Sequence, residues 1–303
     1  MSKITELTGE LREKLPGLEI KAGEPMAAHT SFRIGGPSAL MLLPASAEEL
    51  TEVLRLLHAR GVRPLLLGAG TNVLAPDEGL PGVTVLTRGV SAIEQTGPDT
   101  VTACCGALLS RLAVFAQERG LAGLEFAHGI PGTVGGGVFM NAGAYGGEIR
   151  QVAVRTTVIL PDGTLKDYAG EEQGFRYRGS AFQAAKGTVL RTEFRLTPGD
   201  PAAIRGRMKE LLEKRRASQP LEFPSAGSTF KRPEGYYAGT LIDQCGLKGL
   251  TVGGAQVSEK HAGFVINRGG ATCADVKELI RQIQERVFAQ AGVRLEPEVR
   301  IID

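Results

Sequence analysis

Two glycine-rich segments contain the first residues whose types and spacing could do chemistry. The first, 65–72, reads Leu-Leu-Leu-Gly-Ala-Gly-Thr-Asn, so that a turn of small residues directly follows an apolar run. Backbone N–H groups in such a turn can converge on an anion. Gly68 and Gly70 fit the dinucleotide pattern G-x-G-x-x-G, but Val73 stands at its third glycine and Pro76 disfavours a following helix, which argues against a Rossmann site. An anion-binding turn and an ordinary tight turn both stay open.

The second segment is longer and richer in glycine. Residues 129–137 read Gly-Ile-Pro-Gly-Thr-Val-Gly-Gly-Gly, and 140–147 read Met-Asn-Ala-Gly-Ala-Tyr-Gly-Gly. Serial glycines remove side chains from a surface, so that backbone can approach a large planar or phosphorylated ligand. Thr133 and Asn141 add polar groups. The span 121–147 lacks regular periodicity, and we expect a functional loop there. Two such segments favour an extended nucleotide cofactor, because each can hold a different part of it.

Three patterns in the second half of the chain add candidate catalytic groups. Arg176 and Arg178 are two residues apart, so we expect them on one face of a strand. Ser228 lies in a glycine-containing turn that is not a G-x-S-x-G elbow, which disfavours a serine hydrolase. In the strand expected over 293–302, charged side chains alternate onto one face. Each pattern also has a structural explanation: solvated arginines, a turn-capping serine, and an edge-strand charge ladder of Glu296, Glu298 and Arg300.

Helices and strands that could position these groups follow from periodicity and capping signals. Ser46 and Glu49 form a capping box before an apolar helical face, and Gly61 suits the end of that helix. Asp200 and Pro201 suit the first positions of a basic helix. A Pro161-Asp-Gly163 turn separates two β-rich runs. We expect helices over 4–15, 47–60, 107–119, 201–216, 238–245 and 272–291, and strands over 63–67, 83–87, 101–105, 152–160, 165–168, 189–196, 263–267 and 293–302.

Composition excludes several classes of protein. Lys and Arg number 35 and Asp and Glu 33, and Trp is absent, so we expect neither nucleic-acid binding nor a membrane surface. The N-terminal residues are charged and contain no apolar signal core, and the longest uncharged run is too rich in glycine to span a bilayer. The four cysteines and four histidines show no ligand spacing, so we expect free thiols, no metal and a cytoplasmic protein.

Taken in order, the motifs resemble one family over residues 30–302, the UDP-N-acetylenolpyruvoylglucosamine reductases (MurB). Any one motif is weak, but their shared order and spacing are specific. The distance between Arg178 and Ser228 leaves no room for a long Tyr-bearing insertion, as in the shorter of the family's two types. The motifs are Gly-x-Gly-Thr-Asn (68–72), Gly-Ile-Pro-Gly-Thr-Val-Gly-Gly (129–136), Asn-Ala-Gly-Ala-Tyr-Gly (141–146), Tyr-Arg-x-Ser (177–180), Ala-Gly-Ser-x-Phe-Lys (226–231), Lys-His-Ala-Gly-Phe (260–264) and Pro-Glu-Val-Arg (297–300).

The resemblance implies an α+β protein. Two subdomains would form an FAD-binding fold of the vanillyl-alcohol-oxidase (PCMH) type, and a C-terminal α+β domain would bind the substrate. The ranges that we expect are an N-terminal helix at 1–20, FAD-binding subdomains at 21–85 and 86–200, and a substrate-binding domain at 201–303. A monomer or weak oligomer is expected.

The resemblance also implies the reaction. FAD, held without a covalent bond, would be reduced by NADPH, and hydride would pass from N5 to C3 of the enolpyruvyl group of UDP-N-acetylglucosamine enolpyruvate, with a proton to C2. The product, UDP-N-acetylmuramate, serves peptidoglycan synthesis. Arg178, Ser228 and Glu298 would be catalytic, and Tyr145, Tyr177 and Lys231 would bind the UDP-sugar. The implied FAD contacts are Gly68, Ala69, Gly70, Thr71, Asn72, Val73, Leu74, Gly129, Ile130, Pro131, Gly132, Thr133, Gly135, Gly136, Asn141, Ala144 and Arg300.

The sequence departs from the family pattern at two positions. Ser218 stands where the family usually has a diphosphate-binding lysine, for which a cation within 214–216 could substitute, and Arg232 replaces an asparagine. Two rival functions stay open. Another flavin enzyme of the same fold would often carry FAD covalently, and a non-catalytic nucleotide-binding module would not need Arg178, Ser228 and Glu298 together.

Overall fold

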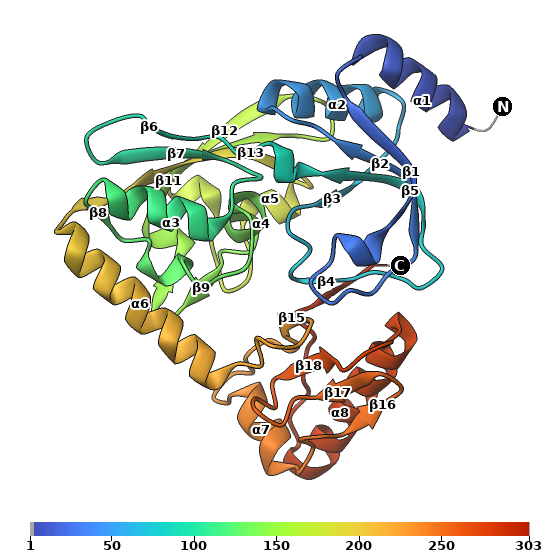
Figure 1. Cartoon of the computed structure of the whole chain (residues 1–303), viewed down its shortest axis with the longest axis vertical. Coiled ribbons are helices and arrows are strands. Elements are labelled where there is room, and N and C mark those ends of the chain that lie inside the picture. The colour runs from blue at the N-terminus through green and yellow to red at the C-terminus, as the bar shows by residue number, and fades with distance from the viewer. Residues whose placement is uncertain (1–2, 303) are drawn as a thin grey trace. The chain divides into compact units, whose positions relative to one another are not determined.

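Figure 1 shows the computed structural model of the chain, which describes residues 3–302. Contacts divide the chain into two compact units that are interleaved in the sequence. Unit 1 contains the chain up to Ala22, Leu40–Ala69 and Gly82–Glu213, and unit 2 contains Gly23–Ala39, Gly70–Pro81 and the chain from Lys214 onward. The four contiguous domains expected from the sequence stay a prediction, because this division does not separate two FAD-binding subdomains within unit 1.

The first sheet has four strands in the order β1-β2-β5-β3, and β3 runs parallel to β5. Helix α2 begins after Ser46, whose hydroxyl accepts the N–H of Glu49 at 3.1 Å, and ends before Gly61, whose φ is +67°. The Ser46 cap and the Gly61 end are therefore confirmed, whereas the reciprocal half of the capping box is not formed, because the Glu49 carboxylate accepts the amide of Ala45 at 2.7 Å. The buried face of α2 packs into the core of unit 1. The elements of this region are α1 (Lys3–Lys14), β1 (Glu19–Pro25), β2 (Pro37–Leu43), α2 (Ala47–Ala59), β3 (Leu65–Leu67), β4 (Val73–Leu74) and β5 (Leu80–Leu86).

The second sheet is antiparallel, with five strands in the order β12-β11-β13-β7-β6. The expected turn at Gly163, with φ +82°, joins β11 to β12. Helix α4 packs against β13 and β7, and Figure 1 shows α3 and α4 on one side of this sheet. The elements are β6 (Ile93–Gln95), β7 (Thr100–Cys104), α3 (Leu109–Glu118), β11 (Ala153–Ile159), β12 (Leu165–Ala169), α5 (Ala181–Ala184) and β13 (Thr188–Arg195).

The span 121–147 is not the irregular loop that its composition suggested. It contains α4 (Val134–Phe139), β8 (Leu121–Ala122), which pairs with β14 (Thr197–Pro198), and the hairpin of β9 (Gly143–Ala144) and β10 (Gly147–Glu148). Glycine is a poor helix former, but tertiary packing offsets propensity where a cap and buried side chains support a short helix. In α4 the support comes from the Thr133 cap and from the buried Val134 and Val138.

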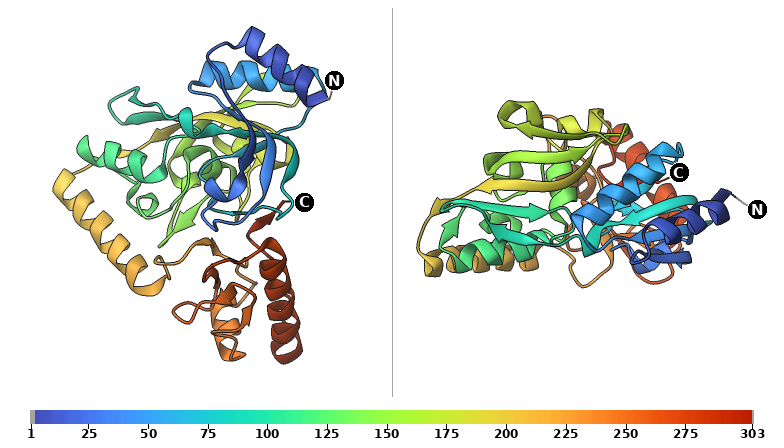
Figure 2. Two further views of the ribbon diagram at one scale, coloured as in Figure 1. Left: turned by 45° about the vertical axis from the view of Figure 1, so that its right-hand side comes forward. Right: turned by 90° about the horizontal axis from the view of Figure 1, so that it is seen from above.

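Unit 2 contains a four-stranded antiparallel sheet in the order β15-β18-β17-β16. Thr272 and Asp275 cap α8 reciprocally, and Gly292 ends it in the left-handed conformation. In the left view of Figure 2, α8 runs alongside the sheet, which it contacts through β16 and β17. The elements are α6 (Pro201–Ser218), which bridges the unit boundary, β15 (Ser225–Ser228), α7 (Ala238–Gln244), β16 (Thr251–Val252), β17 (Ala255–Val257), β18 (Phe264–Asn267), α8 (Cys273–Ala291) and β19 (Arg300–Ile301).

The C-terminal strand is much shorter than expected. Only Arg300–Ile301 form a strand, parallel to Val73–Leu74, whereas the expectation covered 293–302. Residues 296–299 instead bond individually to residues 229–231, around an isolated bridge between Phe230 and Pro297. Pro297 has no N–H to donate, which limits a continuous ladder. The single charged strand face of Glu296, Glu298 and Arg300 is therefore not formed.

Candidate active site

The two glycine-rich segments meet within unit 1. A Cβ atom at Gly68 would lie 2.3 Å from Oγ1 of Thr133, so only glycine fits there. The same Oγ1 accepts the N–H of Gly136 at 3.5 Å and caps α4. Loops that hold one cofactor between them have to be neighbours, and these two are.

Most of the amides that the sequence suggested for ligand binding are used inside the protein. Val134 N donates to Ala107 O at 2.7 Å, and Gly135 N donates to Cys105 O at 2.8 Å. A Cβ at Gly135 would lie 2.8 Å from Cβ of Cys105. The expectation that serial amides face a ligand therefore fails at these positions, where glycine instead allows α4 to pack closely on its neighbours.

Two features of this segment fit a bound FAD. The Nδ1 atom of His128, directly before Gly129, is buried and has no hydrogen-bond partner within residues 3–302. Buried polar atoms in proteins are nearly always paired, so a ligand group is a natural partner. Gly136 is exposed, and a Cβ there would meet nothing nearer than Oγ1 of Thr133 at 3.7 Å, which leaves open surface beside the Thr133 cap.

Arg178 is presented by a tight turn rather than by a strand. Arg176 and Gly179 exchange two backbone hydrogen bonds of 3.0 and 3.1 Å, and Tyr177 and Arg178 form the tip between them. Arg178 has φ +52°, and its guanidinium carbon lies 5.1 Å from the centre of the Tyr177 ring. The expectation of two arginines on one strand face is therefore wrong. A Cβ at Gly179 would lie 2.9 Å from Nε of Arg176, so a larger residue there would crowd the turn.

Asn141 connects this turn to the second glycine-rich segment. Its side chain is buried, and its amide nitrogen donates to the carbonyl of Arg176 at 3.2 Å and to the carboxylate of Glu148 at 3.0 Å. Gln183 supports the same turn by donating to the carbonyl of Arg178 at 3.2 Å. Within unit 1, the side chain of Asn141 is therefore hydrogen-bonded to the turn that carries Arg178.

The segments that carry Ser228 and Glu298 are joined within unit 2 by backbone hydrogen bonds. The amide of Glu298 donates to the carbonyl of Thr229 at 2.8 Å, and the amide of Lys231 donates to the carbonyl of Glu296 at 2.9 Å. The ammonium group of Lys231 also forms an ion pair with Glu296. Ser228 is exposed at the end of β15, next to this pairing.

The end of the first glycine-rich segment belongs to the same cluster. The side-chain amide of Asn72 donates to the backbone carbonyl of Glu298 at 3.2 Å, and the backbone carbonyl of Asn72 accepts the amide of Arg300 at 3.0 Å. Ser31, which the sequence patterns did not indicate, donates through Oγ to Ser225 O at 2.6 Å. No spacing or motif could have identified Ser31, because its partner is far away in the sequence.

The predicted site residues are distributed over both units. Those in unit 1 are Gly68, Ala69, Gly129, Ile130, Pro131, Gly132, Thr133, Gly135, Gly136, Asn141, Ala144, Tyr145, Tyr177 and Arg178; those in unit 2 are Gly70, Thr71, Asn72, Val73, Leu74, Ser228, Lys231, Glu298 and Arg300. Tyr145 and Tyr177 are exposed, at 41% and 52%, which suits residues that would contact a substrate.

Two titratable groups near these segments are held neutral by burial. Phe264 pairs with Ser228 in the sheet and packs edge-on against His261, and burial lowers the pKa of His261. Burial also raises the pKa of Cys105 to about 12. Cys105 therefore stays a thiol, and a thiolate nucleophile at this position is excluded. All four cysteines are free.

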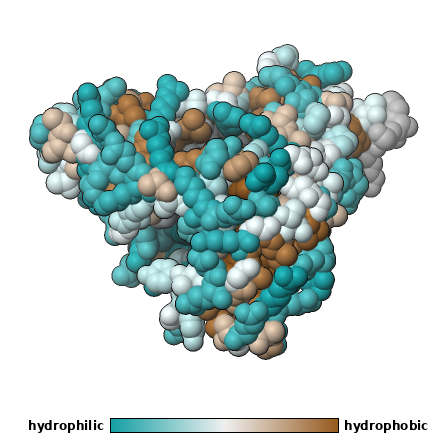
Figure 3. Space-filling model, turned by 60° about the horizontal axis from the view of Figure 1, so that its bottom comes forward, coloured by the Kyte–Doolittle hydropathy of each residue, from teal (hydrophilic) through white to brown (hydrophobic). Residues whose placement is uncertain are grey.

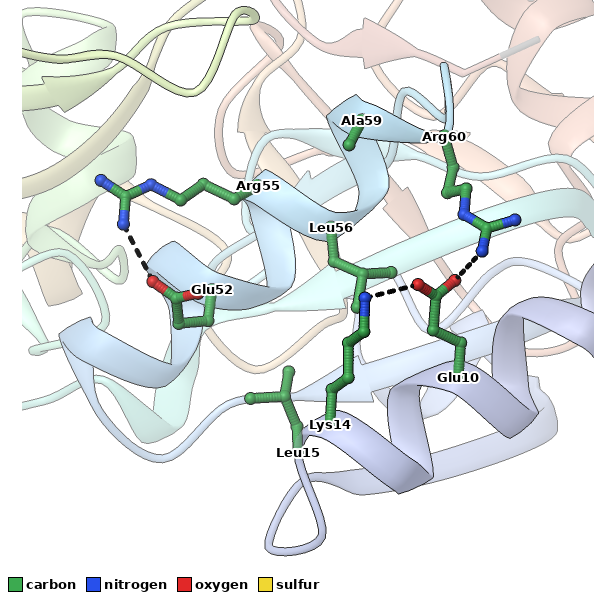
Figure 4. Close-up of a pocket in the computed structure, with 8 residues that line it drawn as sticks. All are labelled: Glu10, Lys14, Leu15, Glu52, Arg55, Leu56, Ala59 and Arg60. Carbon is green, nitrogen blue, oxygen red and sulfur yellow. Dashed lines mark hydrogen bonds and ion pairs between the residues drawn. The ribbon is translucent and has the colours of Figure 1, made fainter.

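A separate pocket of about 380 Å³ lies between α1 and α2 of unit 1 (Figure 4). Its charges are already paired, since Glu10 binds Lys14 at 2.8 Å and Arg60 at 2.6 Å, and Glu52 binds Arg55 at 2.9 Å. None of the predicted site residues lines it. The residues that do are Glu10, Lys14, Leu15, Glu52, Arg55, Leu56, Ala59 and Arg60.

Other kinds of site find little support in the described part of the chain. Between residues 3 and 302, no three His, Cys, Asp or Glu side chains gather closely enough to hold a metal ion. Within the same range, no helix has both the length and the apolar character that crossing a bilayer requires. Figure 3 shows one face of the molecule, where hydrophilic side chains predominate and apolar ones are scattered among them.

Comparison with known proteins now identifies the family. A model of the FAD-binding domain matches residues 38–168, and a model of the UDP-N-acetylenolpyruvoylglucosamine reductase C-terminal domain matches residues 219–302. The reductase of Agathobacter rectalis is 47% identical over 96% of both chains, and that of Carboxydothermus hydrogenoformans is 46% identical over 98% of both. The chain belongs to the UDP-N-acetylenolpyruvoylglucosamine reductase family.

Solved structures agree with this membership. The family member from Thermus caldophilus is 35% identical, with a TM-score of 0.80 over 94% of this chain and 99% of that one. Alkyldihydroxyacetonephosphate synthase, at 18% identity and a TM-score of 0.50 over 65% of this chain and 44% of that one, shares the fold alone. The expected α+β architecture, an FAD-binding fold of the vanillyl-alcohol-oxidase type with a C-terminal family domain, is confirmed.

Proposed function

We propose that this protein reduces the enolpyruvyl group of UDP-N-acetylglucosamine enolpyruvate to give UDP-N-acetylmuramate for peptidoglycan synthesis, with electrons from NADPH. The observation that carries the proposal is the similarity, over nearly the whole chain, to reductases of this family. The hydrogen bonds between residues 229–231 and 296–299, which join the segments of Ser228 and Glu298, support it. A module that only binds nucleotides has no use for this hydroxyl and carboxyl pair. We further propose that it works in the cytoplasm, where NADPH and nucleotide sugars are made, as a monomer or weak oligomer.

FAD, when bound, would supply the redox chemistry, which is hydride transfer from NADPH to C3 of the substrate through N5. The residues that would hold it without a covalent bond include Gly68, Thr133 and Asn141, together with the other predicted FAD contacts. Gly68 and Thr133 support this role because they meet in one place.

Arg178 is proposed to bind the substrate carboxylate and to stabilise the negative charge that spreads into it during reduction. A guanidinium group stays ionised and can bind a carboxylate through two parallel hydrogen bonds. A fixed cation aimed at developing charge stabilises the transition state by about 3 kcal/mol. The turn between Arg176 and Gly179, bonded to Asn141 and Gln183, gives Arg178 the fixed backbone that this role requires.

Ser228 is proposed to deliver the proton to C2 of the substrate. A serine hydroxyl is a weak acid, so neighbouring charge has to stabilise its alkoxide. Glu298 is proposed to orient and support the enolate in its protonated form, since a bare carboxylate beside an enolate would repel it. Tyr145, Tyr177 and Lys231 are proposed to bind the UDP-sugar. A cation within 214–216 is proposed to bind the diphosphate in place of the family lysine, whose position Ser218 occupies.

The test is spectroscopic. The purified protein, loaded with FAD if necessary, is expected to show a flavin absorption spectrum that bleaches with NADPH and returns when the enolpyruvyl nucleotide is added without oxygen. The same titration with NADH measures the preference between the two reductants. A protein that cannot bind FAD would contradict the proposal. So would reduced flavin that the enolpyruvyl nucleotide cannot reoxidise.

The rival flavin enzymes are distinguished by denaturing the same preparation. We expect the yellow colour to separate from the chain in acid, because the proposal has FAD bound without a covalent bond. Colour that stays with the precipitated chain would favour a covalent flavin enzyme of the same fold.

A further inference from the structure

We infer that Thr229 is a positioning residue that fixes Ser228 relative to Glu298 through its buried hydroxyl group. The inference rests on the proposed function and extends it to a residue that does no chemistry itself. It depends on contacts within unit 2.

The first observation is a bulge in β15. Ser225 pairs with Ile266 and Ser228 pairs with Phe264, so β15 has one more residue than β18 between these two pairs. Gly227 adopts φ +76° within the bulge. An extra residue bends a strand and changes the direction of the side chains that follow it. Here Ser228 is exposed, and the next residue, Thr229, is only 3% exposed.

The second observation concerns the hydrogen bonds that hold the residue after the bulge, Thr229, in place. The Oγ1 atom of Thr229 accepts the amide of Val265, in β18, at 3.0 Å. The backbone amide of Thr229 donates to Gly263 O at 2.8 Å. Because the bulge interrupts the regular ladder, a side-chain oxygen replaces the backbone acceptor that Val265 would have met in a regular strand. Without it, a buried amide has no partner.

The third observation links this residue to the carboxyl group. The carbonyl of Thr229 accepts the amide of Glu298 at 2.8 Å. Thr229 is therefore bonded to β18 through its hydroxyl and to the segment of Glu298 through its carbonyl, and it directly follows Ser228. A shift of Thr229 would move Ser228 and the support for Glu298 together. Misplacement of reacting groups by about 1 Å can lower a rate ~100-fold.

The experiment compares T229V, which keeps the shape but removes the acceptor, with T229S, which keeps the hydroxyl. Stopped-flow spectroscopy measures flavin bleaching by NADPH and flavin reoxidation by the enolpyruvyl nucleotide as separate rates. We expect T229V to slow reoxidation about 10-fold or more and to leave bleaching within about 2-fold, on the scale of misplaced groups. T229S is expected to recover most of the reoxidation rate.

The matched control is T192V. Thr192 is also fully buried, in β13 of unit 1, and its hydroxyl is bonded to that of Thr156 at 3.2 Å. T192V shows the effect of deleting a buried hydroxyl that is remote from Ser228 in the sequence. We expect it to leave the ratio of the bleaching rate to the reoxidation rate unchanged. If T229V does not fold, T229C, with a weaker sulfur acceptor, replaces it, and an intermediate loss of the reoxidation rate is expected.

Two results would overturn the inference: a normal reoxidation rate in T229V, or T229V and T192V losing both rates in equal proportion. These results differ from failure of the proposed function, which would appear in the unmodified protein as flavin that is not bleached by NADPH or not reoxidised by the enolpyruvyl nucleotide.

Discussion

The turn that carries Arg178 and the cluster that carries Ser228 and Glu298 position their side chains by different means. Arg178 lies at the tip of a local turn closed by two hydrogen bonds between Arg176 and Gly179, and its own φ is +52°. Ser228 and Glu298 adopt no such conformation. They are joined by pairing between segments that are far apart in the sequence.

The difference predicts how each region responds to mutation. A local turn tolerates loss of a distant contact but is sensitive to the conformational preference of its own residues, because a non-glycine residue at positive φ is strained. A cluster built from distant segments is sensitive to each link between them. Mutations at Arg178 should therefore be able to change turnover without changing stability. Mutations near Ser228 should change the positions of several groups together.

The largest effect is expected at Ser228. In the Ser228→Ala variant, reoxidation of the reduced flavin by the enolpyruvyl nucleotide should fall ~100-fold or more, the scale of a lost positioned acid, while bleaching by NADPH stays normal. Stopped-flow absorbance measures both steps. Equal losses in the two steps would count against proton donation by Ser228 and would leave this cluster with a structural role only.

Arg178 is expected to come next. Arg178→Lys keeps the charge but loses the two-pronged geometry, so turnover should fall about 10-fold to 100-fold. Arg178→Gly removes the strain at positive φ, so it should lose at least as much turnover without a loss of unfolding free energy. Steady-state kinetics measure turnover, and urea titration measures the unfolding free energy. Near-normal turnover in the lysine variant would show that Arg178 has no role in binding the carboxylate.

Glycine positions in the second segment provide a matched pair. Gly135→Ala places a Cβ 2.8 Å from that of Cys105 and should lower the unfolding free energy by about 1–3 kcal/mol, as overpacking does. Gly136→Ala meets nothing closer than 3.7 Å and should be close to neutral for stability. If Gly136→Ala instead weakens FAD binding without destabilising the fold, its open surface faces the cofactor. Equal destabilisation by both variants would contradict the packing explanation.

The smallest expected effect is a dependence of stability on pH, to which one histidine in each unit contributes. Burial lowers the pKa of His58 in unit 1 and of His261 in unit 2. As the pH falls below about 6.5, the unfolded chain takes up protons that the folded chain resists, so stability should fall on acidification. His58→Gln and His261→Gln should each reduce the slope of unfolding free energy against pH, by an amount that corresponds to less than one proton. Urea titration from pH 7.5 to 5 measures this slope. An unchanged slope in both variants would contradict it.

Local patterns in the sequence predicted much of the fold. Ser46 and Asp200 are helix caps as expected, and the Asp200 carboxylate accepts the amides of two residues in the first turn of α6 at 3.1 Å. The hairpin turn at Gly163 is also confirmed. These features depend on hydrogen bonds over a few residues, so the residue types alone identify them. The expectations for 121–147 and 293–302 were wrong where packing against distant segments outweighed local preference.

The sequence by itself determined the family, because the order and spacing of short motifs do not depend on how the chain folds. It also determined which residue types are available for the chemistry. Only the tertiary structure showed that Thr229 bonds to the amides of Val265 and Glu298, and that Ser31 bonds to the carbonyl of Ser225 in β15. It also showed that Gly68 and Gly135 are glycines because Thr133 and Cys105 lie against them. Such contacts join residues far apart in the chain, so no local pattern encodes them.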